Sequence, residues 1–255
     1  MLVTRLPLPL LQPSCAQPRA IRTCLTADPP AERLWAVYDL VDYEALMLSG
    51  AFDEDDDIDD SAEELTYGES DLGFCLSAVE RALDAAELMG CSSSERRNGF
   101  CDVGSGRGAM ALGVALAFPS RLEGNIVALE IVRELCAIAT AAFDLSGDTR
   151  LLSLCGSFYD SPTLERAVCS ARCIYAYASK FASADGVHAE ALSAALAAAL
   201  RAAPDHGRGC VVSIVNRQLC ERDGWIVAAP PLEGPTPEET AEVGLAHFYQ
   251  LSLEE

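Results

Sequence analysis

The feature that most constrains the fold is the stretch FCDVGSGRGA, residues 100–109, which joins a strand pattern to a helix pattern. Its apolar first half carries an acid at Asp102, three glycines then alternate with Ser105 and Arg107, and a helical pattern begins at Ala109. Glycine permits a tight turn and lets a ligand approach the backbone closely. The exposed N–H groups at the start of the next helix face such a ligand. The stretch therefore predicts a ligand-binding loop at the end of a strand.

Short apolar runs alternate with helix-length segments around this loop. Strands are predicted at residues 99–103, 125–129, 151–154, 173–177 and 209–215, and helices at 72–86, 109–118, 132–142, 162–168 and 187–203. This alternation indicates crossover connections and a parallel sheet covered on both faces. Two further strands, at 225–228 and 246–253, are expected on either side of four prolines and a short helix at 238–243. The predicted fold class is α/β: a three-layer, seven-stranded, Rossmann-like sheet with helices on both faces.

A second acid, Glu130, follows the next predicted strand, 28 residues (130 − 102) after Asp102. A carboxylate at this position accepts hydrogen bonds from the hydroxyls of a ribose, and ligands of open α/β sheets bind beyond the carboxyl ends of the strands. The simpler alternatives are a capping or turn carboxylate at Asp102 and a helix N-terminal charge at Glu130. Because both acids fit one ligand, binding is the preferred interpretation.

The glycine order departs from the dinucleotide fingerprint GxGxxG and leaves no place for a pyrophosphate. It resembles the first motif of the class I S-adenosylmethionine-dependent methyltransferases, whose ligand has a cationic sulfonium and an amino-acid head in place of phosphates. The resemblance implies S-adenosyl-L-methionine as cofactor, with Asp102 beside the amino group and Glu130 at the ribose. The implied cofactor residues of this motif are Asp102, Gly104, Ser105, Gly106, Gly108 and Glu130.

Four other segments resemble one branch of that class, the histone-lysine methyltransferases called disruptors of telomeric silencing. They are LTYGES at 65–70, ALEI at 128–131, GSFY at 156–159 and IYAYASKF at 174–181. The resemblance covers roughly residues 65–255, is specific at the first motif and is fainter elsewhere.

This narrower resemblance implies that Tyr67, Glu69 and Ser70 lie near the cofactor and that Phe158 stacks on its adenine. The alternatives are an ordinary loop, with Ser70 capping a helix that starts at Asp71, and a core phenylalanine.

Two positions depart from the pattern of the branch. Ser157 stands where the branch has an acid for the adenine amino group, and Tyr177 stands where it has an asparagine beside the methyl acceptor. We expect cofactor binding to survive the first change, whereas the second weakens the case for lysine methylation. Tyr67, Tyr177 and Ser179 are the candidates to line an acceptor pocket, and a dry pocket lowers the pKa of an amine acceptor. Lys180 is expected to be a solvent-facing loop residue.

The predicted function is therefore S-adenosylmethionine-dependent methyl transfer, with a protein side chain as acceptor by resemblance. One alternative is a degenerate methyltransferase fold that acts as a non-catalytic binding module. Another is a methyltransferase for a small-molecule or RNA acceptor.

The charge balance limits the partners. The 255 residues carry 18 Lys+Arg against 39 Asp+Glu, a formal net charge of −21. A chain this acidic has no broad basic face for phosphates, so direct nucleic-acid binding would need a partner. Residues 53–71 hold 11 acids and no base, which is typical of a solvated linker. The expected organisation is a tail at 1–30, an N-terminal segment with acidic linker at 31–64, and a methyltransferase domain at 65–255.

The first 30 residues and the cysteines bear on the compartment. The first acid is Asp28, and the segment before it contains arginines, hydroxyl residues and prolines. This composition fits a transit peptide, hence chloroplast or mitochondrion, or a disordered tail of a nuclear or cytoplasmic protein. No run of about 18 uncharged apolar residues predicts a membrane span. The 11 cysteines without a CxxC pattern predict free thiols, and the spacing of the three histidines predicts no metal site.

Overall fold

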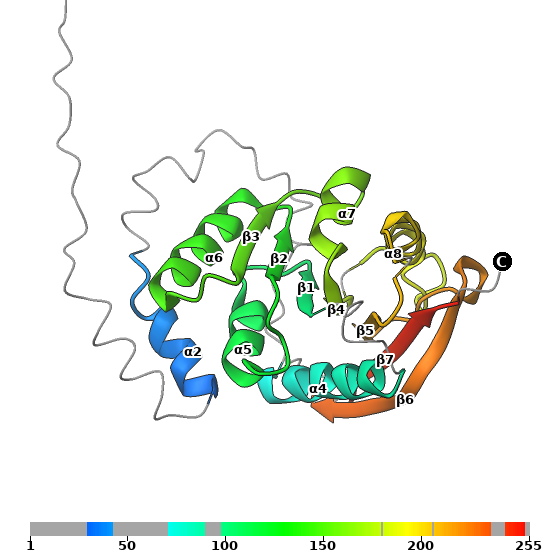
Figure 1. The fold of residues 1–255 in the computed structure, drawn as a ribbon, viewed down its shortest axis with the longest axis horizontal. Coiled ribbons are helices and arrows are strands. Elements are labelled where there is room, and N and C mark those ends of the chain that lie inside the picture. Colours follow the sequence, from blue (N-terminus) through cyan, green and yellow to red (C-terminus); the bar gives the residue numbers. More distant parts are fainter. Residues whose placement is uncertain are drawn as a thin grey trace, which may run out of the picture.

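The computed structural model describes residues 30–42, 71–89, 98–179, 181–205, 207–235 and 243–252. Its strands are β1 (Gly99–Val103), β2 (Ile126–Glu130), β3 (Leu151–Cys155), β4 (Ala171–Tyr177), β5 (Val211–Val215), β6 (Trp225–Pro235) and β7 (Val243–Leu251). They form one seven-stranded sheet in the order β3-β2-β1-β4-β5-β7-β6 (Figure 1). β1 to β5 pair in parallel, whereas β7 runs antiparallel to both β5 and β6.

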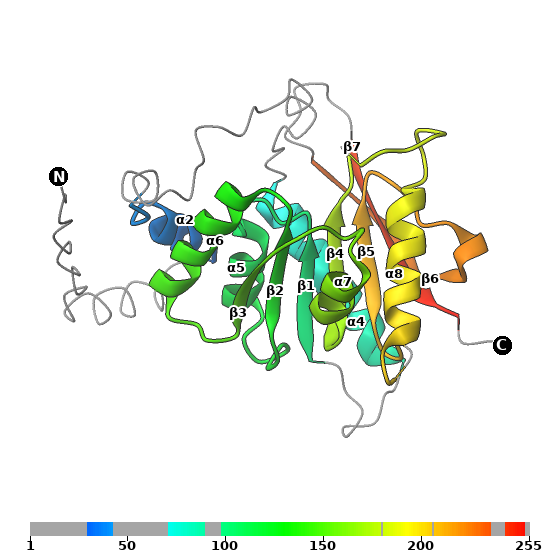
Figure 2. The ribbon, with the colours of Figure 1, turned by 90° about the horizontal axis from the view of Figure 1, so that it is seen from above.

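Helices cover both faces of the sheet. They are α2 (Pro30–Tyr38), α4 (Leu72–Leu88), α5 (Ala109–Ala117), α6 (Arg133–Ser146), α7 (Ser161–Val168) and α8 (Glu190–Ala202), with the 3-10 helix η2 (Glu221–Asp223). α4, α5 and α6 share one apolar cluster with α2, and α7 and α8 share a second with the opposite face. Figure 2 shows α7 and α8 in front of the strands and α4 behind them. The α/β, Rossmann-like fold class predicted from the sequence is confirmed.

The central strands are buried on both faces. Every residue of β1, β2 and β5 is buried, which explains why these runs are nearly continuous in apolar residues rather than alternating. The buried exceptions in β1 and β2 are Asp102 and Glu130. Burying an acid costs free energy unless it gains a partner, so the surroundings of each of these two acids have to be accounted for.

The predicted parallel strands are confirmed to within two residues at each end. α6 continues four residues beyond the predicted end, to Ser146, and stops where Gly147 adopts φ 68°. α8 begins three residues later than predicted, because Asp185 first accepts the backbone N–H groups of Val187 and His188 in a turn.

The prediction that prolines end the first of the two last strands is wrong. β6 runs through Pro230 and Pro231 to Pro235, with register shifts on both sides of Ala229. β6 pairs with β7 alone and lies at the edge of the sheet, where proline's missing N–H removes no ladder bond that is needed. Of the short helix predicted at 238–243, residues 238–242 lie outside the described residues, and Val243 instead begins β7.

Helix α4 starts one residue later than in the alternative interpretation, in which Ser70 caps a helix that begins at Asp71. Asp71 is the N-cap of α4, and its side chain accepts the backbone N–H of Phe74 at 2.7 Å. Ser70 itself lies outside the described residues.

Two general properties follow from the described part of the chain. None of its helices is both long and apolar enough to cross a membrane. The eight cysteines within it are free thiols, and six of them are buried.

Candidate functional site

The glycine-rich loop after β1 is held in a conformation that requires glycine. Gly104, Gly106 and Gly108 have φ of 73°, 54° and 81°, a region in which side chains with a Cβ are strained. The backbone N–H groups of Gly104 and Ser105 both donate to the carbonyl of Leu129, at 2.9 and 3.1 Å. The loop is thereby tied to the end of β2.

Gly108 has a packing role of its own. It caps α5, and a Cβ added there would lie 2.7 Å from Cζ of Phe143 and 3.0 Å from Cβ of Ala139. Only glycine therefore lets the start of α5 pack this closely on α6. Packing alone therefore explains why residue 108 is glycine, whether or not a ligand is bound.

Glu130 links β2 to the middle of the loop. Its Oε2 accepts the N–H of Gly106 at 2.8 Å, and its Oε1 accepts those of Ile131 and Val132 at 2.8 and 3.0 Å. The side chain is nearly buried. These bonds explain how an acid is tolerated here, and they go beyond the simpler alternative of a helix N-terminal charge. A carboxylate has about four acceptor positions, so capacity remains for a ligand hydroxyl.

Asp102 is a buried acid that has no hydrogen-bond partner among the described residues. It is 3% exposed, and its neighbours on the two adjacent strands are Ala128 of β2 and Tyr175 of β4. No described residue donates a hydrogen bond to its carboxylate, so the capping alternative fails. Burial first, and then the charge of Glu130, raise the pKa of this carboxyl from 3.8 to about 8. A cation placed beside Asp102 would restore its charge.

Ser105 carries a second unsatisfied group. The residue is 5% exposed, and its hydroxyl is buried without a hydrogen-bond partner in the described part of the chain. Leaving a buried hydroxyl unpaired costs about 1–3 kcal/mol. Asp102 near the end of β1 and Ser105 on the loop that follows it therefore both offer polar groups that no described side chain engages.

Aromatic rings gather on the far side of the loop. The ring of Phe158 lies 4.3 Å from that of Tyr159 and 5.5 Å from that of Phe181, between centroids. The Phe181 ring packs on Gly104, where an added Cβ would meet its Cζ at 3.1 Å. Phe158 is half-buried against the α7 and α8 cluster, so it is both a core residue and a ring near the loop.

Ser157 is engaged in a local turn. Its hydroxyl oxygen accepts the backbone N–H of Tyr159 at 3.1 Å. The hydroxyl hydrogen is left for another acceptor, whereas the acid of the related branch would itself be an acceptor.

Two of the residues predicted to line a pocket for the methyl acceptor, Tyr177 and Ser179, lie where β4 ends, next to the end of β5. Tyr177 ends β4, and its hydroxyl accepts a hydrogen bond from Nδ2 of Asn216 at 3.3 Å. Asn216 follows β5 with φ 64°, and its Oδ1 accepts the N–H of Leu245 at 3.2 Å. Arg217 donates to the carbonyl of Ser179 at 3.2 Å. An asparagine therefore does stand beside this site, although it comes from β5 instead of β4.

Sequence reasoning missed Phe181, Asn216 and Arg217. The sequence signals were a phenylalanine four residues past a strand end and a polar pair directly after the strand that ends at Val215. Tyr67, Glu69, Ser70 and Lys180 lie outside the described residues, so their predicted positions stay predictions.

Comparison with known proteins bears on the fold. No protein-family model matches the chain, and no curated protein matches it in sequence. TrmN from Thermus thermophilus is similar over 67% of this chain, with 15% identity and a TM-score of 0.46, and the match covers 48% of TrmN. The chain thus spans about half the length of TrmN.

Two further solved structures give comparable values. The rRNA methyltransferase aviRa from Streptomyces viridochromogenes has 12% identity and a TM-score of 0.45, over 73% of this chain and 91% of aviRa. A precorrin-6y C5,15-methyltransferase from Geobacter metallireducens GS-15 has 10% identity and a TM-score of 0.42, over 68% of this chain and 87% of its own. Likeness at this level transfers no activity, so function has to be argued from the geometry above.

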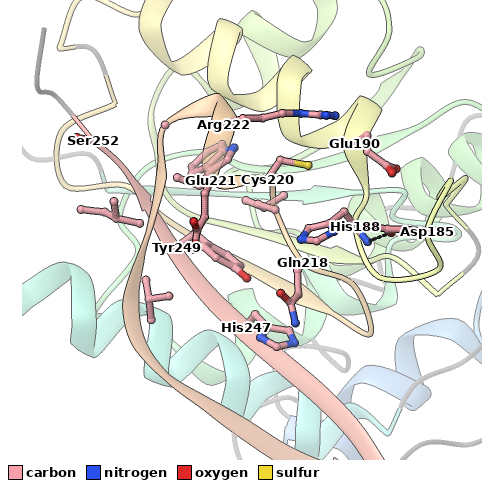
Figure 3. A pocket seen from close by; sticks show the side chains of 15 residues that line it. Asp185, His188, Glu190, Gln218, Cys220, Glu221, Arg222, His247, Tyr249 and Ser252 are labelled. Carbon is pink, nitrogen blue, oxygen red and sulfur yellow. Dashed lines mark hydrogen bonds and ion pairs between the residues drawn. The ribbon is translucent and has the colours of Figure 1, made fainter.

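A separate hollow of about 950 Å³ lies beyond β5, on the face that α8 covers in part (Figure 3). Between β5 and β6 the chain forms only η2, so no long helix covers this side of the outer strands. Figure 3 shows His188, Gln218, His247 and Tyr249 around the hollow. His188 Nδ1 lies 2.7 Å from Asp185 Oδ2, and this bond lowers the pKa of Asp185.

None of the residues predicted from the sequence lines this hollow. In the described ranges, no cluster of His, Cys, Asp or Glu has the arrangement of a metal site. The candidate site is therefore the glycine loop with its two acids, and the hollow is distinct from it.

Proposed function

We propose that the chain is an S-adenosylmethionine-dependent methyltransferase. The observation that carries the proposal is Asp102, a carboxyl that is 3% exposed, lies beside a glycine loop and is unpaired among the described residues. A cationic amino group, such as that of S-adenosylmethionine, would stabilise the charged form of this carboxyl, whereas a phosphate would raise its pKa further. The unpaired hydroxyl of Ser105 and the remaining acceptor capacity of Glu130 fit the polar groups of the same ligand.

Each residue would have a separate task. Asp102 would hold the amino group, Glu130 would accept the ribose hydroxyls, and the rings of Phe158 and Phe181 would flank the adenine and the loop. The bound cofactor supplies a methyl group on a positively charged sulfur. Transfer is an in-line displacement, so the protein contributes mainly alignment of the acceptor with that methyl group.

The acceptor side would be formed by Tyr177, Ser179 and Asn216. Asn216 donates to the Tyr177 hydroxyl at 3.3 Å, and the oxygen of that hydroxyl can accept a hydrogen bond from the group that is to be methylated. An amine acceptor must be neutral to attack, and excluding water from this edge would lower its pKa. We propose a protein side chain as acceptor, on the resemblance in the segments at 156–159 and 174–181.

An RNA acceptor is the main rival, and the charge argues against it. The net charge of −21 provides no basic surface to hold a phosphate backbone. A non-catalytic scaffold is the other rival, but a scaffold has no need of a buried, unpaired acid that destabilises it.

Calorimetry with S-adenosylmethionine on the full chain tests the proposal. We expect binding in the wild type and its loss in Gly106→Arg and Glu130→Ala. Glu123→Ala is the matched control, because Glu123 is an exposed acid away from the loop. No binding to the folded wild-type protein would refute the proposal.

If the cofactor binds, labelled-methyl transfer separates the acceptor classes. Histones, nucleosomes and a cell lysate are offered with labelled S-adenosylmethionine, and the label is followed in protein, RNA and small-molecule fractions. Label in protein supports the proposed acceptor. Label confined to RNA or to small molecules contradicts it.

A further inference from the structure

The N-terminal helix α2 packs on the helix that follows the glycine loop. Leu34 and Val37 are fully buried between α2 and the α5–α6 layer, and Figure 1 shows α2 beside these helices. An added Cβ at Gly113 of α5 would lie 3.3 Å from Leu34 Cδ1, so the two helices approach closely. At the far end of α5, Arg33 donates to the carbonyl of Leu116 at 3.1 Å.

The end of α2 contacts Arg107, the residue of the glycine loop with a long side chain, through both its backbone and its guanidinium. The Tyr38 hydroxyl donates to the backbone carbonyl of Arg107 at 2.6 Å, across 69 positions of sequence. The Arg107 guanidinium lies 5.2 Å from the ring centroids of both Trp35 and Tyr38. Such cation–π contacts contribute about 0.5–1 kcal/mol each at partly exposed sites.

These contacts act on the turn that closes the loop. The carbonyl of Arg107 and the N–H of Gly108 belong to one peptide group, and that N–H donates to the carbonyl of Ser105 at 2.9 Å. Because a peptide group is planar, the bond from Tyr38 to the Arg107 carbonyl also fixes the direction of the Gly108 N–H within the loop. On the sheet side, Leu129 and Glu130 hold the same loop. Three glycines make the loop intrinsically loose, so it needs both anchors.

We propose that α2 is a positioning element for the cofactor loop, with Tyr38 and Arg107 as positioning residues that do not touch the cofactor. The inference rests on the proposed function, because it concerns the same loop. Docking of α2 and cofactor binding then favour one arrangement of residues 104–108. By linkage, each strengthens the other by the same factor.

Tyr38→Phe is the first test, because it removes one hydrogen bond and keeps the ring. We expect the dissociation constant for S-adenosylmethionine to rise about three- to tenfold, the effect of losing one buried hydrogen bond. Arg33→Met is the matched control: it removes a bond of the same helix to the far end of α5, and Leu34 and Val37 keep α2 docked. We expect affinity within twofold of wild type in the control. An equal loss in both variants would overturn the proposal.

Substitutions at Arg107 separate positioning from simple packing. Arg107→Met keeps the stem but removes the cation, so we expect weaker cofactor binding. Arg107→Lys restores a cation over the two rings, and we expect it to recover part of the lost affinity. Equal affinities of the Met and Lys variants would contradict a role for the cation–π contacts.

Tryptophan fluorescence can distinguish positioning of the loop by α2 from a purely structural role of α2, because only the first links cofactor binding to the surroundings of Trp35. The two tryptophans of the chain are Trp35, beside Arg107, and Trp225, buried at the other side of the fold. We expect S-adenosylmethionine to change the emission of wild type and not of Trp35→Phe, while calorimetry still detects binding to that variant. Binding without any change in Trp35 emission would overturn the inference. No binding to wild type would instead refute the proposed function.

Discussion

The Oε2 atom of Glu130 accepts the backbone N–H of Gly106 at 2.8 Å, which ties the tip of β2 to the centre of the glycine loop. The same carboxylate accepts two more N–H groups from its own turn. Glu130 therefore shapes the loop before any ligand binds. Its proposed role in cofactor binding and its role in stability cannot be separated by a single substitution.

A pair of substitutions at Glu130 separates the two roles. We expect Glu130→Ala to leave buried N–H groups unpaired, to lower the free energy of unfolding by about 2–4 kcal/mol and to abolish cofactor binding. Glu130→Gln keeps an amide oxygen that can accept from Gly106, so it should recover most of the stability. It has one acceptor oxygen fewer for the ribose, and we expect affinity to stay at least tenfold reduced. Urea unfolding and calorimetry measure the two effects, and a Gln variant with wild-type affinity would contradict the ribose role.

Asp102 predicts an unusual dependence of stability on pH. Its pKa is about 8 in the folded chain against about 3.9 in an unfolded one, so the folded state keeps a proton that the unfolded state has lost. The stability associated with this group is complete below about pH 4 and is lost as pH rises to about 8. Asp102→Asn removes the titration. We expect the variant to match wild type at acid pH and to exceed it by about 3–5 kcal/mol at pH 9, measured by unfolding at each pH.

The same acid makes cofactor binding release a proton. Pairing with the cationic amino group lowers the pKa of Asp102 from about 8, so binding below that pH expels its proton. We expect affinity to rise between pH 6 and 8 by up to about tenfold per pH unit. Calorimetry in two buffers of different ionisation enthalpy counts the protons released. A count near zero at pH 6.5 would show that Asp102 is not where the cation binds.

Much of this site could be predicted because it is local in sequence. The strand, acid and glycines at 99–108 lie in one segment, and their positive φ angles follow from residue type. Five strands could be placed because fully buried parallel strands form short apolar runs between helices. The two acids could be paired because parallel strands end at one edge of a sheet.

What escaped prediction depends on contacts between distant segments. The sequence shows an acid at 102 but not that it lacks a partner. Phe181 reaches Gly104 and Asn216 reaches Tyr177 only because β1, β4 and β5 are neighbours in the sheet. The docking of α2 follows from a surface on α5 and α6 that exists only after folding. β6 could continue through its prolines because it is an edge strand, which no local pattern reveals.

Asn216 allows the acceptor side to be tested apart from the cofactor. Asn216→Gly and Asn216→Ala both lose the bond from the Leu245 N–H to Asn216 Oδ1, but glycine relieves the strain of φ 64°, so the Gly variant should stay close to wild type in stability and the Ala variant should be about 1 kcal/mol less stable. Both variants lose the amide that orients the Tyr177 hydroxyl. We expect cofactor affinity within twofold of wild type in each and labelled-methyl transfer at least tenfold slower in both. Because the Gly variant relieves strain and the Ala variant keeps it, equal losses of transfer identify the amide as the cause. Full transfer activity in the Gly variant would place the acceptor away from the β4 and β5 ends.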